Sequence, residues 1–286
     1  MPVLVKKIRL YWPLIKSSQT GLLLATGIAG YLSAGTLITL PILFGISMSL
    51  FLAISGSTIM NMWYDHDIDA KMKRTHKRPA ASGELNRREV FYVGMAISFF
   101  GVVWALLIAP LYGLIVFAGW FFDVIVYTVW LKRRTAWSIL WGGISGAMPI
   151  LAGHALAVGH IELVGLLMAL AILFWIPTHT LTFSIKFLDD YNNAGVPTFP
   201  STYGETFTRA MIAISSVLAA VAIGWASALI GISAGYLRLI AVLTAGLLLL
   251  AFATFRVQSE QVNFGLFKYA SLYMLSSMII LAMRSF

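Results

Sequence analysis

The sequence predicts an all-α membrane protein: a polytopic bundle of nine transmembrane helices in a single domain that covers residues 1–286. Two observations predict this fold class. Hydrophobic residues make up 59% of the chain and charged residues only 11%, with a mean hydropathy of +0.86. Apolar runs near the ~20 residues that a helix needs to cross a bilayer recur from one end of the chain to the other. The lipid bilayer is therefore the first expected partner.

Each expected span is an apolar run, and most of the connections between runs are too short for anything but a turn. Two connections are long, at residues 63–88 and 187–206, and both contain acidic clusters. No soluble domain fits between the spans, and the absence of cysteine excludes disulfides and thiolate metal sites. In order, the nine expected spans are 14–35, 38–62, 90–109, 111–131, 137–157, 162–186, 208–230, 234–255 and 265–284.

The basic residues predict the orientation of the bundle. If the N-terminus lies inside and nine spans alternate, then all of the twenty Lys and Arg residues except Arg238 and Arg284 fall on the inner side. This positive-inside bias predicts a multi-pass protein of the cell membrane, with its N-terminus and both long loops in the cytoplasm. The bias also accounts for most of the net charge of +9, so no nucleic-acid partner is expected.

Three acids stand close together at the start of the first long loop. Asp65, Asp67 and Asp69 lie within five positions, in a chain that has only eleven acidic residues. Asp65 and Asp69 are four residues apart, so a continuing helix places them on one face. Carboxylate and amide oxygens suit Mg²⁺, which completes its coordination shell with water and substrate phosphate.

A second acidic pair, Asp189 and Asp190, begins the other long loop and is expected at the same membrane face. Lys and Arg residues near both clusters suit the remaining charge of a phosphate. Acids that are grouped at one face of a membrane protein, beside basic residues, are seldom mere helix ends, because such charges are costly there. Two facing clusters predict a clamp for one diphosphate, which becomes a good leaving group once its charge is stabilised.

These residues resemble the UbiA-type intramembrane prenyltransferase superfamily, whose pattern is two aspartate-rich motifs on cytoplasmic loops of a nine-helix bundle. Asn61-x-x-x-Asp65-x-x-x-Asp69 matches its first motif, and Asp189-Asp190 matches its second in a variant form. Within the superfamily the chain is most similar to the protohaem IX farnesyltransferase (haem O synthase) group. Three stretches carry this likeness: Met72 to Gly83, Tyr127 to Pro149, and Asp189 to Pro200.

The resemblance implies a Mg²⁺-dependent enzyme that joins farnesyl diphosphate to a vinyl group of haem B and so makes haem O. It implies a role for each of a set of residues. The implied catalytic acids are Asp65, Asp69, Asp189 and Asp190; these four and Asn61 are the implied metal ligands; the implied diphosphate ligands are Arg74, Arg78, Lys132 and Lys186; and the implied acceptor contact is His179.

Two alternatives stay open at the level of the sequence. The family tends to have Pro-Pro-His-Phe-Trp where this chain has Pro177-Thr178-His179-Thr180-Leu181, so a quinone precursor or a lipid phosphate is an alternative acceptor. More remotely, Asp123 lies in the middle of a span and is compatible with an ion-coupled transporter. Asp123 suits either a functional role or helix packing, and the oligomeric state is not predicted.

Overall fold

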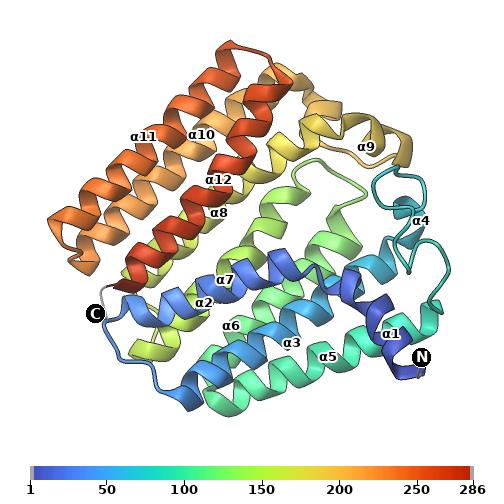
Figure 1. Ribbon diagram of the computed structural model, residues 1–286, viewed down its shortest axis with the longest axis horizontal. Coiled ribbons are helices and arrows are strands. Elements are labelled where there is room, and N and C mark those ends of the chain that lie inside the picture. The colour runs from blue at the N-terminus through green and yellow to red at the C-terminus, as the bar shows by residue number, and fades with distance from the viewer. Residues whose placement is uncertain (1–2, 284–286) are drawn as a thin grey trace.

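Long helices run side by side in the structure, a computed structural model that describes residues 3–283 (Figure 1). No strand occurs in that range, so the all-α prediction is confirmed. The long helices are α2 Ser17–Ser33, α3 Leu40–Tyr64, α5 Arg87–Ile108, α6 Pro110–Phe121 with its continuation η2 Phe122–Leu131, α7 Ser138–Val158, α8 Leu163–Lys186, α10 Phe199–Ile230, α11 Ala234–Arg256 and α12 Glu260–Ala282.

Eight helical rods in residues 3–283 are long and apolar enough to cross a membrane, so the chain is a multi-pass membrane protein. The rod expected at 14–35 is the exception, because α2 has only 17 residues. A short 3₁₀ helix, η1 Trp12–Ile15, and a left-handed backbone at Lys16 (φ 47°) precede it. At 1.5 Å per residue α2 is about 25 Å long, below the ~30 Å of a hydrocarbon core. The predicted count of nine spans is therefore approximate.

Although α2 is short, its second half is buried against α7. A Cβ atom added at Gly30 would come within 2.2 Å of the carbonyl oxygen of Ile150, and one at Gly153 within 1.9 Å of the carbonyl oxygen of Gly27. Only glycine permits the two backbones to approach so closely. This contact fixes the second half of α2 against α7.

The two long loops lie next to each other at one end of the bundle, which is called the acidic end below. The first contains α4 His66–Asp69 and the second contains α9 Leu188–Ala194 (Figure 1). Ile68 and Met72 from the first loop form a small buried cluster with Ala194 and Val196 from the second. The loops are thus packed together by apolar side chains, and their polar residues are brought to one place.

Candidate active site

Asp65 occupies the C-terminal end of α3 and is only 3% exposed. Its Oδ2 forms an ion pair with Lys132, the first residue after η2. Burial by itself would lower the pKa of Lys132, but the neighbouring carboxylate of Asp65 outweighs burial and raises that pKa. Arg133 is farther away, with its guanidinium nitrogen 3.8 Å from Oδ1 of Asp65. Asp65 and Lys132, which are far apart in the sequence, therefore form an ion pair at the centre of the acidic end.

The other two acids of the first cluster each have a cation of their own. Oδ2 of Asp69, which is 5% exposed, accepts a hydrogen bond of 2.8 Å from Arg78. Asp67 points to solvent and accepts two hydrogen bonds from Arg133, at 2.8 and 2.7 Å. These bonds lower the pKa of Asp67 to about 2. Asp65 and Asp69 are buried as expected of site residues, whereas Asp67 belongs to the surface.

The second acidic pair divides in the same way. Asp190 is 7% exposed, and its two carboxylate oxygens accept hydrogen bonds from the backbone amides of Lys73 (3.1 Å) and Arg74 (3.2 Å). Asp190 thereby ties the second loop to the first. Asp189 is exposed, and its side chain has no hydrogen bond or ion pair within residues 3–283. Of the two predicted neighbours, Asp190 is the one turned inward.

The predicted phosphate-binding cations are placed unequally. The Arg74 guanidinium lies over the rings of Phe183 (4.9 Å) and Phe187 (5.5 Å). Lys186 instead faces α12, 3.7 Å from the ring centre of Phe264 and 3.9 Å from a carboxylate oxygen of Glu260. The structure therefore gathers Arg74, Arg78 and Lys132 but not Lys186.

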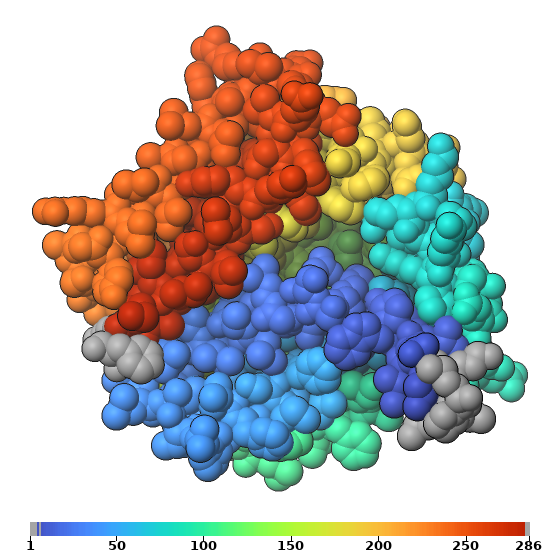
Figure 2. All heavy atoms as spheres, viewed as in Figure 1, coloured from blue at the N-terminus to red at the C-terminus, as the bar shows by residue number. Residues whose placement is uncertain are grey.

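A cavity of about 880 Å³, called the outer chamber, opens between these residues and the helices. Figure 2 shows a recess in this face, bordered by α12 (red), α2 (blue) and the cyan and yellow loop segments. Its charged lining residues are one acid, Asp69, and four cations: Lys16, Arg74, Arg78 and Lys132. Four positive charges and one negative charge leave a net charge of +3, which suits a multiply charged anion.

An inner chamber of about 280 Å³ adjoins the outer one and reaches deeper between the helices. Asn61 and Asp123 line it, together with apolar residues of α3, α6, α7 and α8. Lys16, Tyr127 and His179 line both chambers, so they stand where the two meet. The arrangement provides a cationic entrance with a largely apolar space behind it.

Lys16 is the residue of this site that the sequence prediction missed. Burial, reinforced by Arg78 and Lys132, lowers its pKa to about 8, while Asp123 and Asp69 act in the opposite direction. Its left-handed backbone conformation is unusual for a residue other than glycine. Lys16 was not predicted as a site residue, because spacing alone does not show that this lysine faces a cavity.

His179 is held on α8 by aromatic neighbours. Its ring stacks against Trp175, with ring centres 5.0 Å apart, and against Phe267 at 4.3 Å. Nδ1 of His179 is 3.2 Å from the hydroxyl of Ser271. Trp175 is fixed in turn by its hydrogen bond of 2.7 Å to the carbonyl oxygen of Ala270. The imidazole is therefore a rigid polar group in the wall of both chambers.

The acidic end fits a hard metal ion in the nature of its ligands. Oδ1 of Asp65 is buried without a hydrogen-bond partner, so this oxygen has a free coordination position. No three His, Asp or Glu side chains in residues 3–283 converge closely enough to hold an ion by themselves. Asn61, Asp65 and Asp69 therefore suit Mg²⁺ in the form it commonly takes, with substrate phosphate and water as the other ligands.

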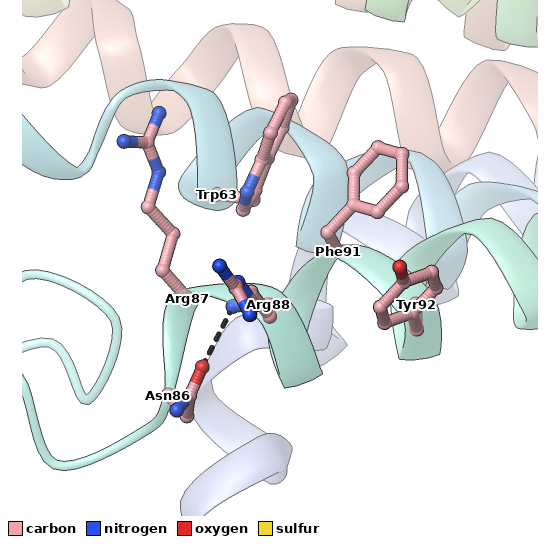
Figure 3. Close-up of a pocket in the computed structure, with 6 residues that line it drawn as sticks. All are labelled: Trp63, Asn86, Arg87, Arg88, Phe91 and Tyr92. Atoms are coloured by element: carbon pink, nitrogen blue, oxygen red, sulfur yellow. Dashed lines mark hydrogen bonds between the residues drawn. The ribbon is translucent and has the colours of Figure 1, made fainter.

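A separate hollow lies at the start of α5, and Figure 3 shows its lining residues. The Arg87 guanidinium rests on the ring of Trp63 at 5.5 Å, and Trp63 also contacts Phe91 with ring centres 4.8 Å apart. None of its lining residues is an acid or borders either chamber. Exposed arginines beside aromatic rings are typical of a membrane interface, and they agree with the orientation signal in the sequence.

Curated relatives with high coverage exist for this chain. A protoheme IX farnesyltransferase of Korarchaeum cryptofilum is 43% identical over 205 residues, which are 72% of this chain and 69% of that protein. Another, from Aeropyrum pernix, is 36% identical over 269 residues, which are 93% of this chain and 88% of that protein. The similarity thus extends over nearly all the spans.

Solved structures share the fold at lower sequence identity. A digeranylgeranylglyceryl phosphate synthase superposes with a TM-score of 0.81 at 18% identity, over 98% of this chain and 99% of that one. A UbiA homolog from Archaeoglobus fulgidus bound to DMAPP and Mg²⁺ gives 0.70 at 15% identity, over 95% and 98%. The UbiA prenyltransferase family itself matches residues 22–274. With this match and the close relatives, the chain belongs to the UbiA prenyltransferase family.

Proposed function

We propose that this prenyltransferase transfers the farnesyl group of farnesyl diphosphate to a vinyl group of protohaem IX (haem B), and so makes haem O. The outer chamber supports farnesyl diphosphate as the donor, because the residues that line it have a net charge of +3 at the entrance to an apolar space. The curated relatives carry it on the acceptor side, since they are protoheme IX farnesyltransferases at up to 43% identity.

The residues at the acidic end would divide the charges of the donor between them. Asp65 and Asp69, with Asn61, would hold Mg²⁺, which when bound neutralises negative charge on the leaving diphosphate. Lys132, Arg78 and Arg74 would bind the phosphate oxygens, and Lys16 would add a fourth cation. Asp190 would keep Arg74 in place through the backbone amides of the first loop. Asp189 and Lys186 would act at a greater distance.

The reaction would begin when the bond between the allylic carbon and the diphosphate oxygen breaks. The diphosphate takes the electron pair and remains bound by Lys132, Arg78 and Arg74. The farnesyl cation would be left between the aromatic side chains that line the chambers, whose ring faces favour positive charge. The outer carbon of the haem vinyl group would form the new C–C bond. Water would then add to the inner vinyl carbon and release one proton, which completes a hydroxyethylfarnesyl group.

His179 would contact the haem acceptor, because it is the imidazole at the junction of the chambers. A neutral imidazole can bind iron or accept a proton, and the stacked neighbours on both sides keep its orientation fixed. We further propose that the acidic end faces the cytoplasm, as the distribution of Lys and Arg predicts. The bundle would then lie in the cell membrane.

The test is an assay of the purified protein with haem B, farnesyl diphosphate and Mg²⁺, followed by mass spectrometry of the haem fraction. We expect haem O from the wild-type protein, and a loss of at least 100-fold in Asp65→Ala. Full turnover by Asp65→Ala would refute the proposed chemistry. An acceptor screen in the same experiment distinguishes the alternative: prenylated quinone precursor or lipid phosphate, without haem O, would favour a different acceptor.

A further inference from the structure

We infer that Asp123 is a positioning residue of the active site: its carboxylate fixes the orientation of the Asn61 amide and so keeps the Asn61 carbonyl oxygen available to the metal. The inference rests on the proposed metal-dependent prenyl transfer. It concerns a residue that the reaction as described does not use, and it assigns a task to an acid placed within a membrane-spanning rod, where carboxylates are costly.

Asp123 lies in the first turn of η2 and lines the inner chamber. Its Oδ2 accepts a hydrogen bond from the hydroxyl of Ser57 and another, of 2.9 Å, from the side-chain amide of Asn61. No lysine or arginine among residues 3–283 forms an ion pair with it. Asp123 is therefore held chiefly by two neutral donors, both supplied by α3.

A carboxylate constrains an amide in a way that no neutral side chain does. An ionised Asp123 can only accept hydrogen bonds, so Asn61 must turn its NH₂ group toward it. The carbonyl oxygen of Asn61 then faces the other way, 2.7 Å from the Thr128 hydroxyl, whose single proton it shares with the backbone carbonyl oxygen of Asp123 at 2.8 Å. That oxygen retains a second lone pair, and an amide oxygen is a suitable Mg²⁺ ligand.

The backbone of η2 provides the spacing that this arrangement needs. Asp123 and Thr128 are five residues apart, and each π-helical hydrogen bond of η2 joins residues five apart, which brings both side chains to the same side of the helix, where they contact Asn61. On α3, Asp65 follows Asn61 by four residues and meets Lys132 of the same rod. Asn61 and Asp65 therefore lie one helical turn apart, and both contact the rod formed by η2 and Lys132.

Helix packing alone is a weaker account of Asp123. A residue that only links two helices needs hydrogen bonds, and an asparagine at this position would supply them to Ser57 and Asn61. Such an amide can also donate, however, so Asn61 could then present either end to it. Only the carboxylate selects one orientation of Asn61, and this difference makes the two accounts separable by experiment.

The experiment measures binding of Mn²⁺, used in place of Mg²⁺, by the purified full-length protein in detergent. Free Mn²⁺ is read by electron paramagnetic resonance, with and without inorganic diphosphate. We expect Asp123→Asn to raise the Kd for Mn²⁺ about tenfold, as is typical when a residue that orients a metal ligand is changed. Ser57→Ala is the matched control: it removes a hydrogen bond to the same oxygen, and we expect less than a twofold change.

A rescue variant separates orientation from folding. An aspartate at position 61 has two equivalent oxygens, so its orientation no longer matters. Asn61→Asp with Asp123→Asn should therefore bind Mn²⁺ within threefold of wild type. The melting temperature of every variant is recorded to confirm folding. Unchanged affinity in Asp123→Asn, an equal loss in Ser57→Ala, or no rescue overturns the inference. If wild type binds no Mn²⁺ under either condition, the metal-dependent function fails as well.

Discussion

Replacement of Lys132 by methionine gives the most direct test of the charge pairing at the acidic end. Methionine keeps much of the length of the side chain but removes the ammonium group that neutralises Asp65. The Asp65 carboxylate is 3% exposed, and its other oxygen already lacks a hydrogen-bond partner. Lys132→Met therefore leaves a buried negative charge whose nearest cation is Arg133, 3.8 Å away.

Loss of one partner of a buried ion pair typically costs about 3–5 kcal/mol. Arg133 compensates in part and the site borders a cavity, so we take the lower end, about 3 kcal/mol. For a chain of this size that corresponds to a fall in Tm of about 6 °C. The double variant Asp65→Asn with Lys132→Met removes both charges. It should recover at least half of the loss, because neither charge is then left alone.

Thermal unfolding of the purified variants in one detergent measures these effects, and added Mg²⁺ provides the decisive comparison. With Lys132 absent, Asp65 is free to bind a metal, so Mg²⁺ should raise the Tm of Lys132→Met more than that of wild type. Affinity for inorganic diphosphate should fall at the same time. A Tm of Lys132→Met within 1 °C of wild type, or an equal effect of Mg²⁺ on both proteins, would refute this reasoning.

Two further predictions concern the second loop and Lys16. Asp190→Ala should increase the rate of amide hydrogen exchange in the first loop at least tenfold, because two backbone amides lose their acceptor, whereas Asp189→Ala should leave that rate unchanged. Mass spectrometry of the peptide spanning 66–79 measures both rates, and equal rates in the two variants would contradict the prediction. Burial lowers the pKa of Lys16 to about 8, so Lys16 loses its charge as pH rises through 8, and affinity for diphosphate should fall. Calorimetric titration from pH 7 to 9.5 should show this fall in wild type but not in Lys16→Arg, and an identical pH profile in Lys16→Met would contradict it.

The helices were predictable from the sequence because both the lipid bilayer and a packed protein interior require apolar side chains, and hydropathy measures these directly. Their ends were less predictable, since they depend on local hydrogen bonds. The apolar run at 208–230 predicted a helix there, yet α10 begins at Phe199, with Thr198 as a capping residue and a change of direction at Gly204 (φ 81°). Similarly, hydropathy does not predict the left-handed backbone of Lys16, after which α2 begins at Ser17.

The sequence predicted which residues belong to the site better than it predicted which of them contact each other. Spacing suggested that Asp65 and Asp69 share a helical face, and although α3 ends at Tyr64, the Asp69 amide still donates to the Asp65 carbonyl oxygen at 2.8 Å. Spacing did not show that each of the two acids pairs with a different cation. The partner of Asp65 is Lys132, which is 67 positions away, and no local pattern identifies it. Nor does the sequence show which of Asp189 and Asp190 turns inward. Pairing across helices depends on the packed fold, which spacing along one chain does not contain.

The observed pairing has a consequence for how a donor can bind. With Oδ2 of Asp65 held by Lys132 and Asp69 held by Arg78, a lone cation would be repelled by the neighbouring ammonium and guanidinium groups, and a lone diphosphate would be repelled by the carboxylates. If the two arrived together, Asp65 and Asp69 would hold the metal, and Lys132 and Arg78 would bind phosphate oxygens. No buried charge would then be left without a partner, which would avoid the cost of an unpaired ion. We therefore expect each ligand to increase affinity for the other, and by linkage the factor must be the same in both directions.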